Sequence, residues 1–173
     1  QIDALIAAAE TAQNSGRDIR VNFAGAGPQA DRVAEISQTT PFVNFRGVYD
    51  YLSERDELYG SADIIYAVYP QDVPNNRFHI ARRFQEAVLL GIPVIVADGS
   101  YMAEIVKETG VGWSVDSENP EALKNLLIST YDDQDSLRRC TEASRLVRHQ
   151  HDFERYTGPL VDILDRVNQN SKS

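Results

Sequence analysis

Hydrophobic and polar positions follow first a helical period and then a strand pattern within residues 80–99, the most informative stretch of the chain. Helical spacing gives its first part an apolar and a polar face, made respectively by Ile80, Phe84, Ala87 and Val88 and by Arg82, Gln85 and Glu86. Gly91 suits a left-handed C-cap, and Pro93 prevents the helix from continuing. Residues 93–97 are apolar and rich in β-branched side chains without alternation, which predicts a central strand of a parallel sheet.

The rest of the chain repeats this order of strand and helix. We predict helices over residues 2–14, 29–37, 51–62, 100–109, 120–131, 133–149 and 153–168, and strands over 20–24, 43–46, 63–68 and 112–115. Leu52, Leu58 and Tyr59 are the expected inward residues of the helix at 51–62, and residues 69–78 are expected to form a polar loop. The alternation predicts an α/β fold, a Rossmann-like doubly wound parallel sheet flanked by helices, with its site at the carboxyl edge of the strands.

Length, composition and charge place this pattern in one globular domain spanning residues 1–173, with a C-terminal helix and frayed tail at 150–173. The formal net charge of −9 argues against a general nucleic-acid surface, and no apolar run is long enough for a membrane span. The single Cys140 cannot form an internal disulfide, which favours a reducing cytoplasmic setting. Because the chain opens with Gln1 inside an amphipathic helix, we expect it to be part of a longer protein.

Positive charge gathers where the helix within residues 80–99 begins. Arg77, His79, Arg82 and Arg83 lie within seven residues of an otherwise acidic chain. Cations in the first turn of a helix oppose its dipole, by about 0.3–1 kcal/mol each when exposed. An anion bound at the helix N-terminus would remove this conflict, because free N–H groups and arginines would both point at it. The alternative, a solvated face with an Arg82–Glu86 pair, stays open at this point.

A second candidate site follows the strand predicted at residues 20–24. Gly25-Ala26-Gly27 lies between that strand and a helix, the arrangement that can bring a backbone close to a phosphate. The third glycine of the dinucleotide-binding fingerprint is missing, which favours a plain tight turn for these glycines taken alone. The loops at 25–28, 47–50 and 69–79 are all expected at the same carboxyl edge of the sheet.

Several motifs together resemble the C-terminal half of GT-B-fold glycosyltransferases, in particular the large bacterial family that builds capsule, lipopolysaccharide and related glycans. They are Val-Asn-Phe-Ala-Gly-Ala-Gly-Pro, Val-Asn-Phe-Arg-Gly-Val, Ser-Ala-Asp-Ile, Gln-Glu-Ala-x4-Gly-Ile-Pro-Val-Ile and Gly-x-Gly-Trp, in this order. In that family this half binds the nucleotide-sugar donor, a separate N-terminal half binds the acceptor, and the reaction often needs no metal. The resemblance implies a UDP- or GDP-sugar donor, with no cofactor and no metal.

The resemblance also assigns roles to individual residues. Glu86 corresponds to the second glutamate of the family's Glu-x7-Glu motif, which grips the ribose hydroxyls as a carboxylate can. Arg82, Arg83 and the helix N-terminus starting at Ala81 would hold the donor diphosphate and stabilise charge on the leaving group. The other implied donor contacts are Gly25 near the cleft, Gly47, Val48 and Tyr49 by the base, and Asn76 and His79 near the sugar.

The sequence departs from the family at the first glutamate, where Phe78 stands eight residues before Glu86. Asn75, Asn76 or His79 could contact the sugar instead, or donor binding could be lost. The alternatives to a glycosyltransferase are therefore a sugar-nucleotide 2-epimerase half, which shares the fold, and a degenerate non-catalytic nucleotide-binding or assembly module. The family's first strand of this half, with its basic donor-binding residues, is expected to precede Gln1.

For the longer protein, the resemblance implies sugar transfer to a glycan or lipid-linked acceptor in bacterial polysaccharide biosynthesis. Its expected partners are the nucleotide-sugar donor and an N-terminal acceptor-binding domain of the same chain, with no nucleic acid. We expect a cytoplasmic location, at the inner face of the membrane if other parts of the protein bind it. This chain alone is expected to be inactive.

Overall fold

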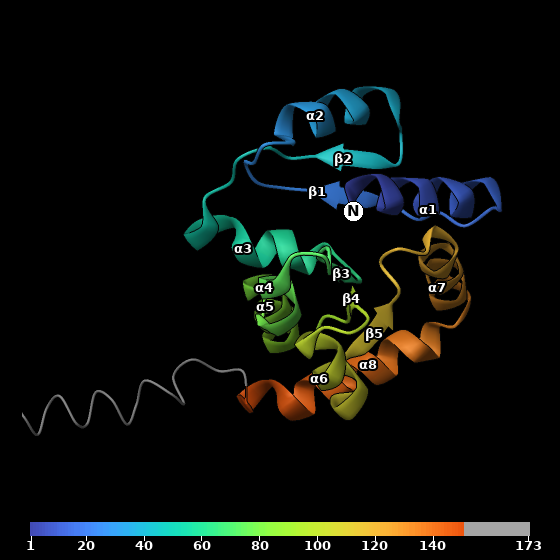
Figure 1. Cartoon of the computed structure of the whole chain (residues 1–173). Helices are drawn as coiled ribbons and strands as arrows, with labels where there is room; N and C mark the ends of the chain where they lie inside the picture. The colour runs from blue at the N-terminus through green and yellow to red at the C-terminus, as the bar shows by residue number, and fades with distance from the viewer. Residues whose placement is uncertain (151–173) are drawn as a thin grey trace, which may run out of the picture.

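The computed structural model describes residues 1–150, which alternate between helices and short parallel strands (Figure 1). The helices are α1 (Ile2–Asn14), α2 (Ala30–Thr39), α3 (Tyr51–Gly60), α4 (Pro74–Phe78), α5 (Arg82–Leu90), α6 (Tyr101–Thr109), α7 (Pro120–Asp132) and α8 (Gln134–Val147), with a 3-10 turn η1 (Arg148–Gln150). The strands are β1 (Val21–Phe23), β2 (Val43–Phe45), β3 (Ile65–Ala67), β4 (Val94–Ala97) and β5 (Gly112–Val115). The helix predicted at 153–168 and the tail lie outside the described residues.

The strands form two parallel sheets, and this confirms the predicted α/β class. β1 pairs with β2 in the register Val21–Val43, and β4 lies between β3 and β5. All four residues of β4 are buried, as predicted for a central strand. The doubly wound sheet is divided because β1 and β3 are not hydrogen-bonded to each other. Val21 of β1 nevertheless shares a hydrophobic cluster with Ile95 of β4, so the two sheets rest on a common core.

Helices cover the three-stranded sheet and build two hydrophobic clusters. Figure 1 shows α5, α6 and α8 near β3–β5 in the lower part of the view, with α1 beside β1 and α7 below α1. α5 enters the first cluster through Phe84, Ala87 and Val88, each fully buried. These are residues of the predicted apolar face, so the helical period identified the inner side of α5 correctly. Packing of that face in the core fixes the orientation of α5, and with it the positions of its polar side and its N-terminus.

The ends of several helices lie where the sequence predicts them. Gly91 has φ of 77°, the left-handed conformation expected at the end of α5. Ser100 caps α6, and Asn119 caps α7 just before Pro120. Local chemistry decides these positions, because a cap depends on side chains within a few residues of the helix end.

Two local predictions were wrong. The segment predicted as a loop at 69–78 contains the short helix α4, which starts at Pro74, a residue whose fixed φ suits the first helical position. Leu52 was expected to face inward, but 91% of it is exposed, because Tyr59 is the residue of α3 that enters the core. Within residues 1–150, no helix combines the length and the apolar character that crossing a bilayer requires.

Candidate functional site

The N-terminus of α5 lies beyond the carboxyl end of β3 and has no side-chain cap. Its N-cap residue is Ala81, whose N–H points at Met102 Sδ at 3.5 Å. The N–H groups of Arg82 and Arg83 have no acceptor within residues 1–150, and no acidic side chain lies in the first turn. Because sulfur is a weak acceptor, this helix end combines poorly satisfied amides with two cations. Within the predicted contact at the helix N-terminus starting at Ala81, the amides of Arg82 and Arg83 are thus the ones left for a ligand.

Arg83 is held against the edge of β3. Its Nη1 donates to the main-chain oxygen of Tyr66 at 3.3 Å, and its guanidinium lies 5.2 Å from the ring centroid of Tyr69. The N–H of Ile65 donates to the carbonyl of Pro93, so the backbone groups of Ile65 face β4. Successive residues of a strand direct their backbone groups to opposite sides, so the carbonyl of Tyr66 points away from β4. Arg83 thus occupies the edge of β3 that no strand pairs within the described residues. It does not pair with a carboxylate in that part of the chain.

Glu86 lies one turn further along α5 and is turned toward α3. Its Oε1 accepts hydrogen bonds from the Tyr51 hydroxyl and from Arg82 Nε, the latter at 2.8 Å, while Oε2 accepts one from the Tyr59 hydroxyl at 2.6 Å. Only 11% of the Glu86 side chain is exposed, against 69% for Arg82. The predicted Arg82–Glu86 pair therefore exists, but Glu86 is not on a solvated face.

Burial and hydrogen bonding act on the Glu86 carboxylate in opposite directions. Burial alone would raise its pKa, but the hydrogen bonds from Tyr51, Tyr59 and Arg82 together lower the pKa below the ordinary value. Burial of the Tyr59 hydroxyl, reinforced by its hydrogen bond to Glu86, raises the pKa of Tyr59. Glu86 is consequently an ionised acceptor beside neutral hydroxyl donors at physiological pH.

His79 and Asn76 precede α5 and have different surroundings. The His79 ring meets the Tyr69 ring edge-on with centroids 5.0 Å apart. Its Nδ1 is buried without a hydrogen-bond partner within residues 1–150, as is Oε1 of Gln71. Asn76 Nδ2 donates to the carbonyl of Pro70 at 2.8 Å, which secures the turn before α4. Of the two, His79 is the one with a buried polar atom that has no hydrogen-bond partner within residues 1–150.

Two glycine loops meet at the ends of β1 and β2. The N–H of Gly25 donates to the carbonyl of Gly47 at 2.7 Å. Both residues have positive φ, 116° and 78°, which a side chain would disfavour. Val48 is 79% exposed next to this contact. Tyr49 follows Val48 directly in the chain, in the same loop after β2. The structure therefore brings these predicted residues together in one loop pair.

Phe78 ends α4 and is 76% exposed, so this position offers an aromatic ring rather than a carboxylate.

The sequence-based site lacked two residues that the structure adds, Tyr51 and Tyr59. They lie 35 and 27 positions before Glu86, and no local pattern signals contacts over such separations. Among residues 1–150, no cluster of three or more His, Cys, Asp or Glu side chains is placed to hold a metal ion.

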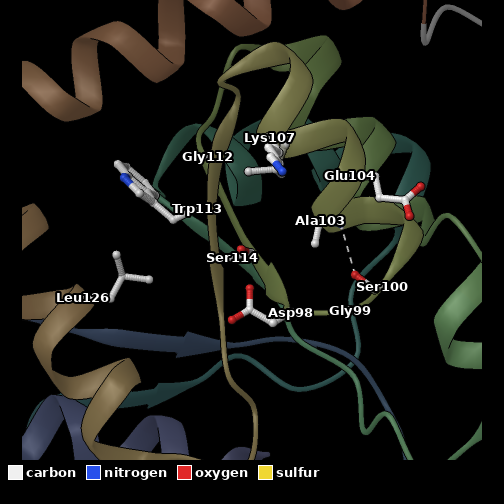
Figure 2. A pocket seen from close by; sticks show the side chains of 11 residues that line it. Asp98, Gly99, Ser100, Ala103, Glu104, Lys107, Gly112, Trp113, Ser114 and Leu126 are labelled. Atoms are coloured by element: carbon white, nitrogen blue, oxygen red, sulfur yellow. Dashed lines mark hydrogen bonds between the residues drawn. The ribbon is translucent and has the colours of Figure 1, made fainter.

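A separate hollow of about 480 Å³ begins at the loop after β4 and runs along β5 and α6 (Figure 2). Its lining includes Asp98, Ser100, Glu104, Lys107 and Trp113. Figure 2 shows Trp113 and Lys107 on opposite sides of β5 and Asp98 near the start of the hollow. None of the residues predicted for donor binding lines it. The hollow is therefore distinct from the candidate site around α5.

Comparisons with solved structures support the fold. The chain superimposes on Anabaena Alr3699/HepE, solved with UDP and glucose, with a TM-score of 0.69 at 18% identity, covering 95% of this chain and 43% of that one. Sucrose-phosphate synthase from Thermosynechococcus elongatus gives 0.66 at 18% identity, covering 97% and 42%. WaaG, a glycosyltransferase involved in lipopolysaccharide biosynthesis, gives 0.64 at 18%, covering 94% and 41%. The chain thus spans less than half the length of these proteins.

Sequence comparisons add the family. No curated protein matches the sequence. The family model described as glycosyl transferases group 1 matches residues 1–147, most of the chain and nearly all of its described part. The match takes in both glycine loops, the uncapped helix end and Glu86. This chain belongs to the glycosyl transferases group 1 family.

Proposed function

We propose that this chain is the donor-binding domain of a glycosyltransferase, and that it binds a UDP- or GDP-sugar. The observation that carries the proposal is the N-terminus of α5, where two arginines converge with two amides that have no acceptor, side-chain cap or first-turn acid within residues 1–150. Such an end favours a bound anion. Membership in the glycosyl transferases group 1 family supports a nucleotide diphosphate as this anion.

The diphosphate would be bound by the amides and guanidinium groups of Arg82 and Arg83. As the bond between sugar and diphosphate breaks, negative charge grows on the leaving phosphate, and fixed donors and cations lower the energy of that state. Arg83 can turn toward the ligand by giving up a long hydrogen bond of 3.3 Å to the carbonyl of Tyr66 and its contact with the Tyr69 ring. His79 Nδ1, buried without a hydrogen-bond partner in the described part of the chain, is our candidate for a contact to the sugar.

The nucleoside would lie between α5 and the loop after β2. Glu86 supplies an ionised acceptor for the ribose hydroxyls, and Val48 and Tyr49 flank the base. Gly25 and Gly47 keep the two loops close through their mutual hydrogen bond. Asn76 would support the sugar side through the turn that it secures.

Transfer needs more than this domain. The chain spans 43% of the length of HepE, and we propose that an N-terminal acceptor-binding domain of the same protein completes the cleft. The acceptor would be a growing glycan or a lipid-linked sugar in polysaccharide, capsule or lipopolysaccharide biosynthesis. WaaG, a protein of similar fold, is involved in lipopolysaccharide biosynthesis. We propose a cytoplasmic location, with any membrane contact made by other parts of the protein.

Calorimetric titration with UDP, GDP and ADP tests the donor site. One diphosphate should bind, and Arg83→Ala should weaken it about tenfold or more, as expected for a hydrogen bond to a charged group. Arg138→Ala, on an exposed arginine of α8, is the matched control and should leave affinity unchanged. Titrating a longer chain that includes the strand proposed to precede Gln1 completes the test. No binding to either chain would overturn the proposal.

A second candidate is a non-catalytic nucleotide-binding or assembly module. Phe78 favours it, because this exposed residue stands where the Glu-x7-Glu motif implied by the resemblance would have its first glutamate, and an aromatic ring cannot accept hydrogen bonds from sugar hydroxyls as a carboxylate does. The two proposals differ in the sugar. A catalytic domain should bind the intact nucleotide sugar at least as tightly as the free diphosphate, whereas a module that has lost the sugar contact should not.

A further inference from the structure

Two tyrosines of one helix hold the Glu86 carboxylate from two sides. Tyr59 is 8% exposed and belongs to the core cluster, and its hydroxyl donates to Oε2 at 2.6 Å. Tyr51 stands at the first position of α3 and donates to Oε1. Arg82 Nε donates to the same oxygen at 2.8 Å. Three donors thus already occupy the carboxylate.

Counting acceptor sites shows that this arrangement cannot also hold a ribose diol. An ionised carboxylate has about four lone-pair sites, about two on each oxygen. Oε1 already has two donors, and Oε2 has one. A vicinal diol that donates two hydrogen bonds needs two acceptor sites, but one remains. One of the present donors must therefore leave before both ribose hydroxyls can bind Glu86.

Tyr51 is the donor that can leave with the least loss. Tyr59 would have to be pulled out of the core cluster. Arg82 is the cation paired with a carboxylate that is 11% exposed, and removing it would leave that charge without a partner. The Tyr51 hydroxyl is a neutral donor at the start of a helix, so a ribose hydroxyl can replace it one for one.

We propose that Tyr51 occupies the ribose-binding side of Glu86 in the chain without nucleotide and is displaced by the donor, whereas Tyr59 is a positioning residue that holds the carboxylate. This inference rests on the proposed function, in which Glu86 binds ribose. Displacement would also affect Arg82, whose guanidinium stacks 3.9 Å above the centroid of the Tyr51 ring. Tyr51 directly follows the loop of Val48 and Tyr49, so ribose binding and the base-contacting loop would move together.

Opposite effects of two like substitutions test this proposal. With the diphosphate that the wild type binds, UDP or GDP, Tyr51→Phe should tighten binding about five-fold, the effect of removing one competing hydrogen bond. Tyr59→Phe should weaken it by a similar factor, because Glu86 loses a donor that orients it. Both variants keep the aromatic ring, and Tyr131→Phe on α7 is the control, expected to be neutral.

A second arm uses the 2′-deoxy form of the same diphosphate. Its ribose donates one hydrogen bond where the parent donates two, and the free site on Oε2 can accept it without displacing Tyr51. The gain from Tyr51→Phe should therefore shrink toward none. Weaker or unchanged binding of the normal diphosphate by Tyr51→Phe would overturn the inference alone. Absence of binding by the wild type and by the longer chain would instead overturn the proposed function, and the inference with it.

Discussion

α5 and α6 follow neighbouring parallel strands, yet their first turns are built in opposite ways. α6 begins with Ser100, whose Oγ accepts the N–H of Ala103 at 3.2 Å, and it has Glu104 in its first turn. α5 begins with Ala81, which has no side-chain acceptor, and continues with Arg82 and Arg83. A capping side chain and an early acid both stabilise a helix. α6 has both devices and α5 has neither.

This difference indicates which helix end is arranged for a ligand. A helix that only has to be stable satisfies its own amides, as α6 does. The amides of Arg82 and Arg83 remain unpaired within residues 1–150, and their side chains add positive charge. An anion supplies both the missing acceptors and the missing charge. α5 must then take its stability from its buried face, and this can be measured.

The largest effect is expected from truncating a side chain on the buried face of α5. Phe84 is fully buried in the core cluster, and Phe84→Ala should lower the free energy of unfolding by about 3–5 kcal/mol. Leu90→Ala is the control, because Leu90 is 42% exposed on the same helix and should change stability by about 0.5 kcal/mol or less. Urea denaturation followed by circular dichroism measures both. Equal losses would mean that α5 is not anchored by its apolar face.

The next effect breaks the cap of α6. Ser100→Ala removes the acceptor for Ala103 and the 2.7 Å hydrogen bond to the carbonyl of Ala97. The loss should be about 1–2 kcal/mol, the upper range for an N-cap, because Ser100 is 1% exposed. Ser53→Ala, at an exposed position inside α3, should be nearly neutral in the same urea titration. If Ser100→Ala leaves the free energy of unfolding unchanged, the cap does not stabilise α6, and the contrast between α5 and α6 has no energetic basis.

The sequence predicted this part of the fold because the signals are local. Gly91, Pro93 and the apolar run after them identify the end of α5 and the central strand β4. The unfavourable interaction of Arg82 and Arg83 with the helix dipole could be predicted from the position of these cations in the first turn of the helix. Each of these features depends on residues a few positions apart.

Features set by distant contacts were not predictable in this way. Leu52 has the spacing of an inward residue, but α3 meets the core only through Tyr59. Glu86 belongs to the polar face of α5, yet two tyrosines from α3 cover it. The division of the strands into two sheets likewise depends on pairing between segments far apart in the chain. Helical periodicity separates polar from apolar faces but does not show which polar face meets another helix.

A smaller effect is expected from giving α5 an N-capping side chain like that of α6. Ala81 has φ of −67° and ψ of 140°, the extended conformation typical of an N-cap. Ala81→Ser should raise stability by about 0.5–1 kcal/mol and weaken nucleotide binding, because the new hydroxyl takes an amide that the diphosphate would use. Ala81→Gly changes the same position without adding an acceptor and should not weaken binding. Calorimetry that finds wild-type affinity for Ala81→Ser would show that these amides do not bind the ligand.

The smallest effect concerns how stability depends on pH. The pKa of Glu86 is below its usual value of 4.5 in the folded chain. The unfolded state therefore binds the proton more readily, and the stability contributed by this group is present above about pH 4.5 and lost as pH falls through the folded pKa. Exposed carboxylates such as Asp132, held by Arg17, add to the same slope. Glu86→Gln should make the fall in unfolding free energy between about pH 5 and 3 less steep, measured by urea titration at each pH. Glu10→Gln, at an exposed position of α1 outside its first turn, removes a carboxylate that the helix end does not stabilise and serves as the control. If the two variants change the slope equally, the hydrogen bonds from Tyr51, Tyr59 and Arg82 do not hold Glu86 ionised more firmly than solvent does.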